Sequence, residues 1–129
     1  MPDAHLISIV DDDPSARLAI ARLVRSLGWH AHSFASAAEF LNSPRLHDTS
    51  CALIDAQMPR LDGLALQRRL LALKIFIPVI FMTALPDDIV RARALSAGAV
   101  CFLTKPLHGP ALVECIDAAL LRWNRVCPR

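Results

Sequence analysis

The sequence predicts an α/β protein in which a five-stranded parallel sheet carries helices on both faces. Three observations indicate this class: short apolar runs of strand length recur five times, segments of helical period separate them, and the connecting loops are short. Parallel strands need crossover connections, usually helices, and such crossovers are right-handed. Four of the five runs are almost continuously apolar, which is typical of strands buried on both faces.

The five predicted strands are rich in β-branched or aromatic residues, and we place them at residues 6–10, 30–34, 51–54, 78–82 and 100–103. The second contains the most polar residues, His30, His32 and Ser33. His30 and His32 lie two apart in it, and therefore on one face. With no third ligand nearby, an exposed edge strand is a better interpretation than a metal site.

Polar residues mark where the first two predicted helices begin. Asp13 is a suitable N-cap, and Pro14 occupies the first helical position. Ser36 and Glu39 form a capping box for a short helix that ends near Leu41.

Apolar residues at helical spacing predict which faces of the helices are buried. The stripes of the first, third and last helices are Ile20, Leu23, Val24 and Leu27; Leu66, Leu70 and Leu73; and Leu112, Ile116, Ala119 and Trp123. The fourth helix, about residues 87–97, has the weakest apolar face, and Gly28 and Gly98 are natural ends for the first and fourth.

Length and composition predict a single compact domain over residues 1–129. The chain is 54% hydrophobic and 20% charged with a net charge of +2, which excludes a disordered protein. The longest apolar run, residues 75–85, contains Pro78 and is shorter than the roughly 20 residues of a membrane span. No signal peptide is visible, so we expect a cytoplasmic protein. The arginines are dispersed, so the charge does not favour direct nucleic-acid binding.

The four cysteines form no C-x-x-C pair and show no metal-ligand spacing; they are Cys51, Cys101, Cys115 and Cys127. Cys51 and Cys101 lie inside apolar runs, so we expect both to be buried. Without an export signal, all four are predicted to be free thiols.

Charged and hydroxyl side chains follow four of the predicted strands. They are Asp11, Asp12 and Asp13 after the first, Asp55 after the third, Thr83 after the fourth, and Lys105 with Pro106 after the fifth. In parallel sheets, ligands bind beyond the carboxyl ends of the strands, where the winding direction reverses. Clustered carboxylates repel one another, and a hard cation such as Mg²⁺ relieves that repulsion.

This set of side chains is suited to phosphoryl chemistry. An ammonium such as Lys105 and a hydroxyl such as Thr83 are partners for phosphoryl oxygens, and an aspartate beside them is a credible phosphoryl acceptor. Taken singly, each residue is better explained as a turn former, helix cap or surface residue. Their joint occurrence at four strand ends is hard to obtain from turn chemistry alone.

With these residues in view, the whole chain resembles the receiver domain of bacterial response regulators. The matching residues are Asp11-Asp12, Asp55-Ala56-Gln57-Met58-Pro59 with Gly63, Thr83-Ala84, and Lys105-Pro106. The resemblance implies a flavodoxin-like, doubly wound sheet of order 2-1-3-4-5. Residues 34–41 and 99–106 are most similar to the FixJ-type subgroup, whose receivers usually precede a DNA-binding domain.

The resemblance also implies roles for the site residues. Asp55 is expected to accept a phosphoryl group from a phosphohistidine of a sensor histidine kinase. Asp12 and Asp55 are expected to bind Mg²⁺ directly, Asp11 largely through water, and the main-chain carbonyl of Gln57 to complete the site. The domain is then a signalling substrate, with slow autodephosphorylation as its only reaction.

A switching mechanism is implied as well. Lys105 is expected to pair with the phosphoryl group, next to a Lys105–Pro106 bond that is typically cis in this family. Thr83 is expected to move toward the phosphoryl group while Phe102 turns inward. The fourth helix, fifth strand and fifth helix would form the output face and a possible homodimer interface. The output would be transcription, through a domain outside this chain, so this domain itself would not contact nucleic acid.

The loop after Thr83 departs from the subgroup, because Ala84-Leu85-Pro86-Asp87-Asp88 replaces a glycine-rich loop. We expect this change to affect which partner fits the domain more than the phosphoryl chemistry. A receiver that signals without phosphorylation is a second possibility.

The strongest enzymatic alternative is a phosphatase of the haloacid dehalogenase type. The run 11–15 matches its D-x-D-x-[ST] motif, with Asp11 as nucleophile and Asp13 as acid. That chemistry requires an acidic pair after the lysine, whereas Asp87 and Asp88 precede Lys105.

Overall fold

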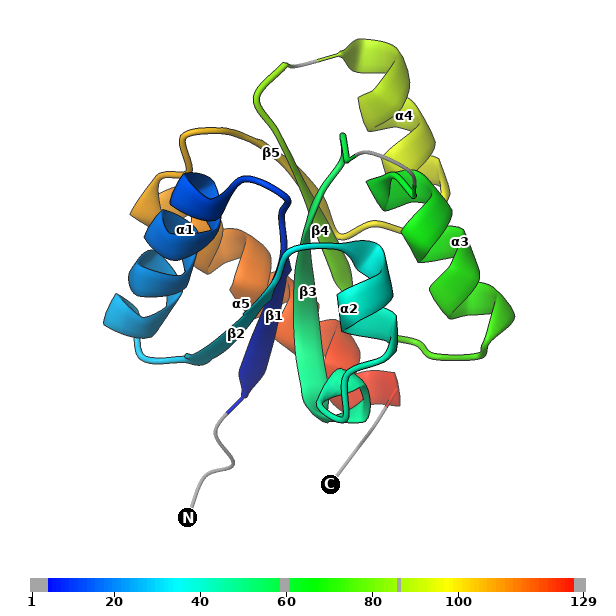
Figure 1. Ribbon diagram of the computed structural model, residues 1–129, viewed down its shortest axis with the longest axis horizontal. Coiled ribbons are helices and arrows are strands. Elements are labelled where there is room, and N and C mark those ends of the chain that lie inside the picture. Colours follow the sequence, from blue (N-terminus) through cyan, green and yellow to red (C-terminus); the bar gives the residue numbers. More distant parts are fainter. Residues whose placement is uncertain (1–4, 59–60, 86, 127–129) are drawn as a thin grey trace.

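The computed structural model describes residues 5–58, 61–85 and 87–126, in which strands and helices alternate (Figure 1). The strands are β1 (Leu6–Val10), β2 (His30–Phe34), β3 (Thr49–Asp55), β4 (Val79–Thr83) and β5 (Cys101–Thr104). The helices are α1 (Pro14–Ser26), α2 (Ala37–Leu41), α3 (Gly63–Ala72), α4 (Asp88–Ser96) and α5 (Gly109–Val126), with a 3-10 turn at Leu46–Asp48.

The five strands form one parallel sheet of order β2-β1-β3-β4-β5, which confirms the predicted flavodoxin-like topology. Helices α1 and α5 cover one face, and α2, α3 and α4 cover the other (Figure 1). Two apolar clusters fill the spaces between the sheet and these layers. One contains Ile20 and Ile116 on the α1/α5 side, and the other contains Phe40 and Leu66 on the opposite side.

The predicted helix caps are present. Asp13 accepts a hydrogen bond from Ser15 N at 3.1 Å, and Ser36 Oγ accepts one from Glu39 N at 3.1 Å. Gly28 and Gly98 follow α1 and α4 with φ of 102°, a conformation that side chains rarely adopt.

Polar residues lengthen β3 beyond the predicted 51–54. Thr49 and Ser50 are buried in the strand, because Thr49 Oγ1 lies 2.6 Å from Ser8 Oγ and 3.1 Å from the Arg45 carbonyl oxygen. The Thr49 hydroxyl is therefore paired inside the sheet, and the Ser50 hydroxyl lies 3.3 Å from His5 Nδ1. An apolar pattern alone does not detect such buried polar residues.

Two burial predictions were wrong. Leu73 was expected in the α3 stripe, but α3 ends at Ala72 and the Leu73 side chain is 54% exposed as the C-cap. β5 was expected to be buried on both faces, but it is an edge strand whose residues are half-buried or exposed. In contrast, Leu112, Ile116 and Ala119 of α5 are fully buried as predicted.

The prediction of free thiols was also wrong for one pair. Cys101 in β5 and Cys115 in α5 form a disulfide, with their Cα atoms 5.9 Å apart. They are 14 positions apart in the sequence, and only the packing of α5 against β5 brings them together. Cys51 is a free, fully buried thiol as predicted, whereas Cys101, also expected to be buried, is only half-buried because it lies in the edge strand β5. The prediction for Cys127 lies outside the described residues, as do Pro59 and Pro86.

His30 and His32 are exposed on the edge strand β2, in agreement with the edge-strand interpretation. Among the described residues, no helix is both long and apolar enough to cross a bilayer.

Candidate functional site

The predicted site residues meet at the carboxyl edge of the sheet. Asp11 follows β1, Asp55 ends β3, and Thr83 ends β4. The parallel register aligns Val10 with Ile54 in the neighbouring strand, so these ends are level. Lys105 is placed beside them because its main-chain N–H donates to the Thr83 carbonyl oxygen at 2.7 Å.

Three carboxylates form an acidic cluster at this edge. Asp11, Asp12 and Asp55 each offer a carboxylate oxygen, and these oxygens lie within 4.8 Å of one another. Asp11 and Asp55 are buried, whereas Asp12 is exposed. Close carboxylate oxygens with a solvent-facing side are the donor set of a hard, partly hydrated cation, so these residues fit Mg²⁺.

Lys105 joins two of these carboxylates. Its Nζ lies 2.6 Å from Asp11 Oδ2 and 3.2 Å from Asp55 Oδ2. Burial opposes the charged ammonium, but the hydrogen bond and charge of Asp11, followed by those of Asp55, outweigh it and raise the pKa of Lys105. The lysine therefore supplies a positive charge at the site at neutral pH.

Asp55 is held in place by its surroundings. Its Oδ1 accepts a hydrogen bond from Gln57 N at 2.9 Å. Burial raises the pKa of Asp55, and the Gln57 hydrogen bond and the charge of Lys105 reduce that rise. The first residue of α3, Gly63, packs directly behind it, since an added Cβ would lie 2.6 Å from the Asp55 carbonyl oxygen.

Thr83 is almost completely buried, at 1% exposure. Its Oγ1 accepts from Leu85 N at 3.1 Å and lies 3.0 Å from the Leu85 carbonyl oxygen and 3.4 Å from Gln57 Oε1. Gln57 therefore links the loop beside Asp55 to Thr83. Phe102 is half-buried and packs against the cluster on the α3/α4 side of the sheet.

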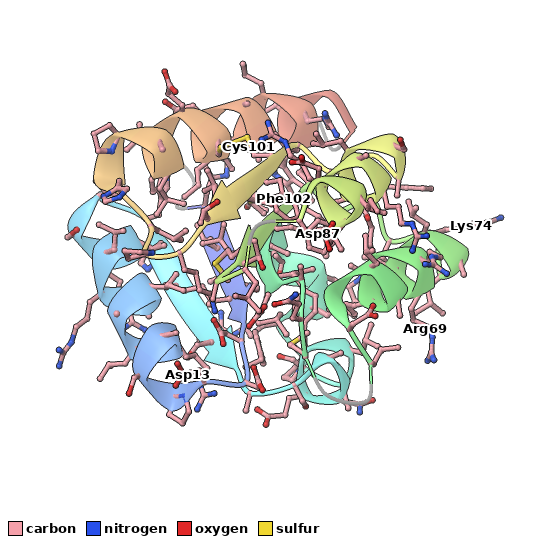
Figure 2. All side chains as sticks on the ribbon, turned by 90° about the horizontal axis from the view of Figure 1, so that it is seen from above. Asp13, Arg69, Lys74, Asp87, Cys101 and Phe102 are labelled. Atoms are coloured by element: carbon pink, nitrogen blue, oxygen red, sulfur yellow. A yellow bond between two sulfur atoms is a disulfide. The ribbon has the colours of Figure 1, made fainter. Side chains whose placement is uncertain are left out.

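The structure brings together Asp11, Asp12, Asp55 and Lys105. Thr83 is connected to this group by Gln57, whose main-chain N–H donates to Asp55 and whose side-chain oxygen lies near the Thr83 hydroxyl. Asp13 is not part of the cluster and caps α1 instead (Figure 2). The Lys105–Pro106 bond is cis, as the resemblance implied.

Two supporting side chains were not predicted from sequence. Only the main-chain carbonyl of Gln57 was predicted to take part in the site, yet the Gln57 side chain places its Oε1 near Thr83. The other is Arg17, whose Nη1 donates to the Asp11 carbonyl oxygen at 2.8 Å and so stabilises the loop after β1. No motif or spacing in the sequence indicates that Arg17, six residues after Asp11, makes this contact.

Comparison with known proteins agrees with this geometry. Residues 7–117 match the family model described as the response regulator receiver domain. The chain belongs to the receiver domain family of response regulators. This is a family of signalling domains of two-component systems, and the haloacid dehalogenase alternative is thereby set aside.

Named relatives support the assignment and the FixJ-type resemblance. The chain is 40% identical to the response regulator protein TodT of Pseudomonas putida strain F1, over 91% of this chain and 52% of TodT. It is 34% identical to the transcriptional regulatory protein FixJ of Azorhizobium caulinodans, over 95% of this chain and 58% of FixJ. The chain thus spans little more than half the length of these two relatives.

A solved structure leads to the same conclusion. The crystal structure of FixJ-N is 32% identical, with a TM-score of 0.83 over 94% of this chain and 96% of that one. The order 2-1-3-4-5 and the layers of helices are therefore those of the receiver fold.

Proposed function

We propose that Asp55 accepts a phosphoryl group from the phosphohistidine of a sensor histidine kinase, in a Mg²⁺-dependent reaction that switches this domain. Residues 1–129 act in this proposal as one receiver unit. The observation that supports it best is the position of Lys105 Nζ, which lies 2.6 Å from the Asp11 carboxylate and 3.2 Å from that of Asp55. A positive charge beside the acceptor carboxylate is what phosphoryl transfer needs, since positioning and charge neutralisation dominate that reaction.

In this reaction an Asp55 carboxylate oxygen attacks phosphorus, the phosphorus–nitrogen bond breaks, and the imidazole leaves with the bonding electron pair. Asp12 and Asp55 are proposed to bind Mg²⁺ directly, Asp11 mainly through water, and Gln57 through its main-chain carbonyl. Bound there, the ion supplies neutralisation of the phosphoryl charge. Lys105 then exchanges its contact with Asp55 for a phosphoryl oxygen. Slow hydrolysis of the acyl phosphate is the only other reaction proposed.

The switch is proposed to run from Thr83 to Phe102. The Thr83 hydroxyl, now shared with Leu85, turns to a phosphoryl oxygen, and Phe102 fills the space this leaves. The register supports this coupling, because Thr83 pairs with Thr104, two residues beyond Phe102 in β5. The α4, β5 and α5 surface is then the output face, and a homodimer through it is proposed for the phosphorylated protein.

The output is proposed to be transcription. FixJ, to which the chain is similar, is named a transcriptional regulatory protein, and this chain spans 58% of it. An output domain outside residues 1–129 would contact DNA, and the receiver would not. The proposed location is the cytoplasm.

The test is labelling by a small phosphodonor in the presence of Mg²⁺, followed by intact mass and peptide mapping. Wild-type protein and Asp13→Asn are expected to gain one phosphoryl group on Asp55, because Asp13 caps α1 outside the acidic cluster. Asp55→Asn is expected to gain none. Equal labelling of Asp55→Asn, or a label on Asp11, would contradict the proposal. A correctly folded wild type that stays unlabelled would favour a receiver that signals without phosphorylation.

A further inference from the structure

The disulfide between Cys101 and Cys115 connects two elements of the proposed output face. Cys101 is the first residue of the edge strand β5, and Cys115 lies in the second turn of α5. Figure 2 shows the bond beside β5, with Phe102 next along the strand. Because α5 is a separate layer from the sheet, this bond ties a sheet edge to the helix that covers it.

The two cysteines differ in their surroundings. Cys115 is 7% exposed and belongs to the apolar cluster on the α1/α5 side. Cys101 is only half-buried and packs against the edge of that cluster. A small thiol reagent therefore reaches the Cys101 sulfur first, while the Cys115 sulfur is confined next to it.

Residue alternation in β5 places this pair next to the proposed switch. Cys101 and Leu103 pack against the α1/α5 cluster, whereas Phe102 between them packs against the opposite cluster. The strand that carries Phe102 is thus fastened to α5 through the neighbouring residue. Breaking or forming the bond changes how firmly β5 is held without altering a side chain of the acidic cluster.

We propose that Cys101 and Cys115 form a reversible redox site, oxidised by low-molecular-weight disulfides, that locks β5 onto α5. In the first step the Cys101 thiolate attacks a disulfide RSSR, forming a Cys101–SR bond and releasing RS⁻. In the second, the Cys115 thiolate attacks the Cys101 sulfur and releases a second RS⁻. The two protons lost by the cysteines end on the two RSH molecules, so two thiols are oxidised and one RSSR is reduced.

The matched internal control is Cys51. Its thiol is fully buried in β3, and burial raises the pKa of Cys51, so its reactive thiolate form is suppressed. It should stay unmodified in the folded protein in either redox state. A Cys127→Ser background leaves the other three cysteines to be followed.

The first experiment treats this background with oxidised glutathione, then denatures it and alkylates the free thiols. Only Cys51 is expected to be alkylated, with a cross-linked peptide pair containing Cys101 and Cys115 that dithiothreitol releases. Alkylation of all three cysteines after oxidation, or a cross-link involving Cys51, would overturn the proposal.

The order of reaction is tested with single variants whose folding is checked by circular dichroism. Cys115→Ser is expected to accumulate a stable glutathione adduct on Cys101, because the resolving thiol is missing. Cys101→Ser is expected to leave Cys115 unmodified. An adduct on Cys115 and none on Cys101 would overturn the assignment. Cys115→Ala, which keeps the site apolar, replaces Cys115→Ser if serine prevents folding.

The locking is tested by amide hydrogen exchange in β5. Oxidation closes a ring of about fifteen residues, so the unfolding equilibrium constant is expected to fall at least about tenfold, with β5 amides slowed most. Equal exchange of the β5 amides in the oxidised and reduced protein would overturn the proposed locking.

The consequence for signalling rests on the proposed function. Phosphoryl labelling of Asp55 should be the same in the oxidised and reduced protein, while the change that phosphorylation causes in β5 should be smaller in the oxidised protein. If Asp55 is labelled in neither state while the cross-link and the slower β5 exchange are observed, the proposed function is wrong and the redox site is still supported.

Discussion

The central strands and the β5–α4 edge are built differently. Every residue of β1, β3 and β4 is buried. Asp11 directly follows β1, and β3 and β4 end at Asp55 and Thr83. β5 is half-buried or exposed, and of α4 only Ala94 is buried. One part of the sheet therefore fixes the acidic cluster, while the other is held by few apolar contacts.

This difference shows how a small domain can combine a rigid site with a movable face. Residues that position charges must sit on elements with high local stability, because a small displacement weakens electrostatic interactions. Elements that change position are drawn from the low-stability part of a fold. The two regions meet where the Lys105 N–H bonds the Thr83 carbonyl oxygen, so a change at the site reaches β5 directly.

The largest expected difference between the regions comes from truncating the same residue type in each. Leu53→Ala in β3 removes a fully buried side chain and should lower the free energy of unfolding by about 3–4 kcal/mol. Leu103→Ala in β5 removes a partly buried one and should cost about 1–2 kcal/mol. Urea unfolding measures both, and equal losses would contradict the comparison.

Gly63→Ala tests the packing behind the acceptor. Its Cβ would lie 2.6 Å from the Asp55 carbonyl oxygen and 2.8 Å from Phe81 Cε1, so the backbone of the site must shift. We expect a loss of about 2–3 kcal/mol and weaker phosphodonor labelling. The control is Gly109→Ala, where nothing lies within 4 Å of the new Cβ. If Gly63→Ala matches Gly109→Ala in stability and labelling, the close packing of Gly63 against Asp55 contributes to neither property.

Helix caps should respond differently in the two regions. Asp87 accepts from Ile89 N at 2.8 Å at the start of α4, and Asp13 caps α1 in the same way. Each alanine variant loses about 1 kcal/mol of helix stability. For Asp13→Ala this should lower global stability, because α1 is packed on the sheet. For Asp87→Ala the loss should appear as faster amide exchange confined to α4. A decrease in the global free energy of unfolding as large as that of Asp13→Ala would count against this prediction.

The smallest expected effect concerns pH. Burial raises the pKa of Asp55, so between its unfolded and folded pKa values the unfolded chain binds fewer protons. Stability therefore falls as pH rises through that window and stays lower above it. Asp55→Asn cannot ionise and should therefore be slightly more stable than wild type at neutral pH. The gain should disappear below about pH 4 in thermal unfolding with a chelator present. A gain that is independent of pH would refute this cause.

Much of this organisation could be predicted from the sequence. The alternation of elements, the span of β2, the caps at Asp13 and Ser36, and the residues at the strand ends all follow from local pattern and turn chemistry. The site was predictable because parallel strands bring their carboxyl ends to one edge.

What escaped prediction depends on tertiary contacts. The start of β3 at Thr49 depends on a hydroxyl pair with Ser8, forty-one residues away. The disulfide depends on where α5 lies on β5, and the role of the Gln57 side chain depends on its distance from Thr83. None of these contacts has a fixed sequence spacing, so they cannot be predicted from periodic patterns in the sequence.

The central claim, that folding assembles a phosphoryl and cation site around Asp55, is tested most directly by a crystal structure with Mg²⁺ and beryllofluoride. Density for beryllofluoride is expected with its beryllium bonded to an Asp55 carboxylate oxygen and Lys105 Nζ beside a fluorine, and a cation is expected against Asp12 and Asp55. Beryllofluoride bound at Asp11, or an empty Asp55 with the cation held elsewhere, would contradict the account.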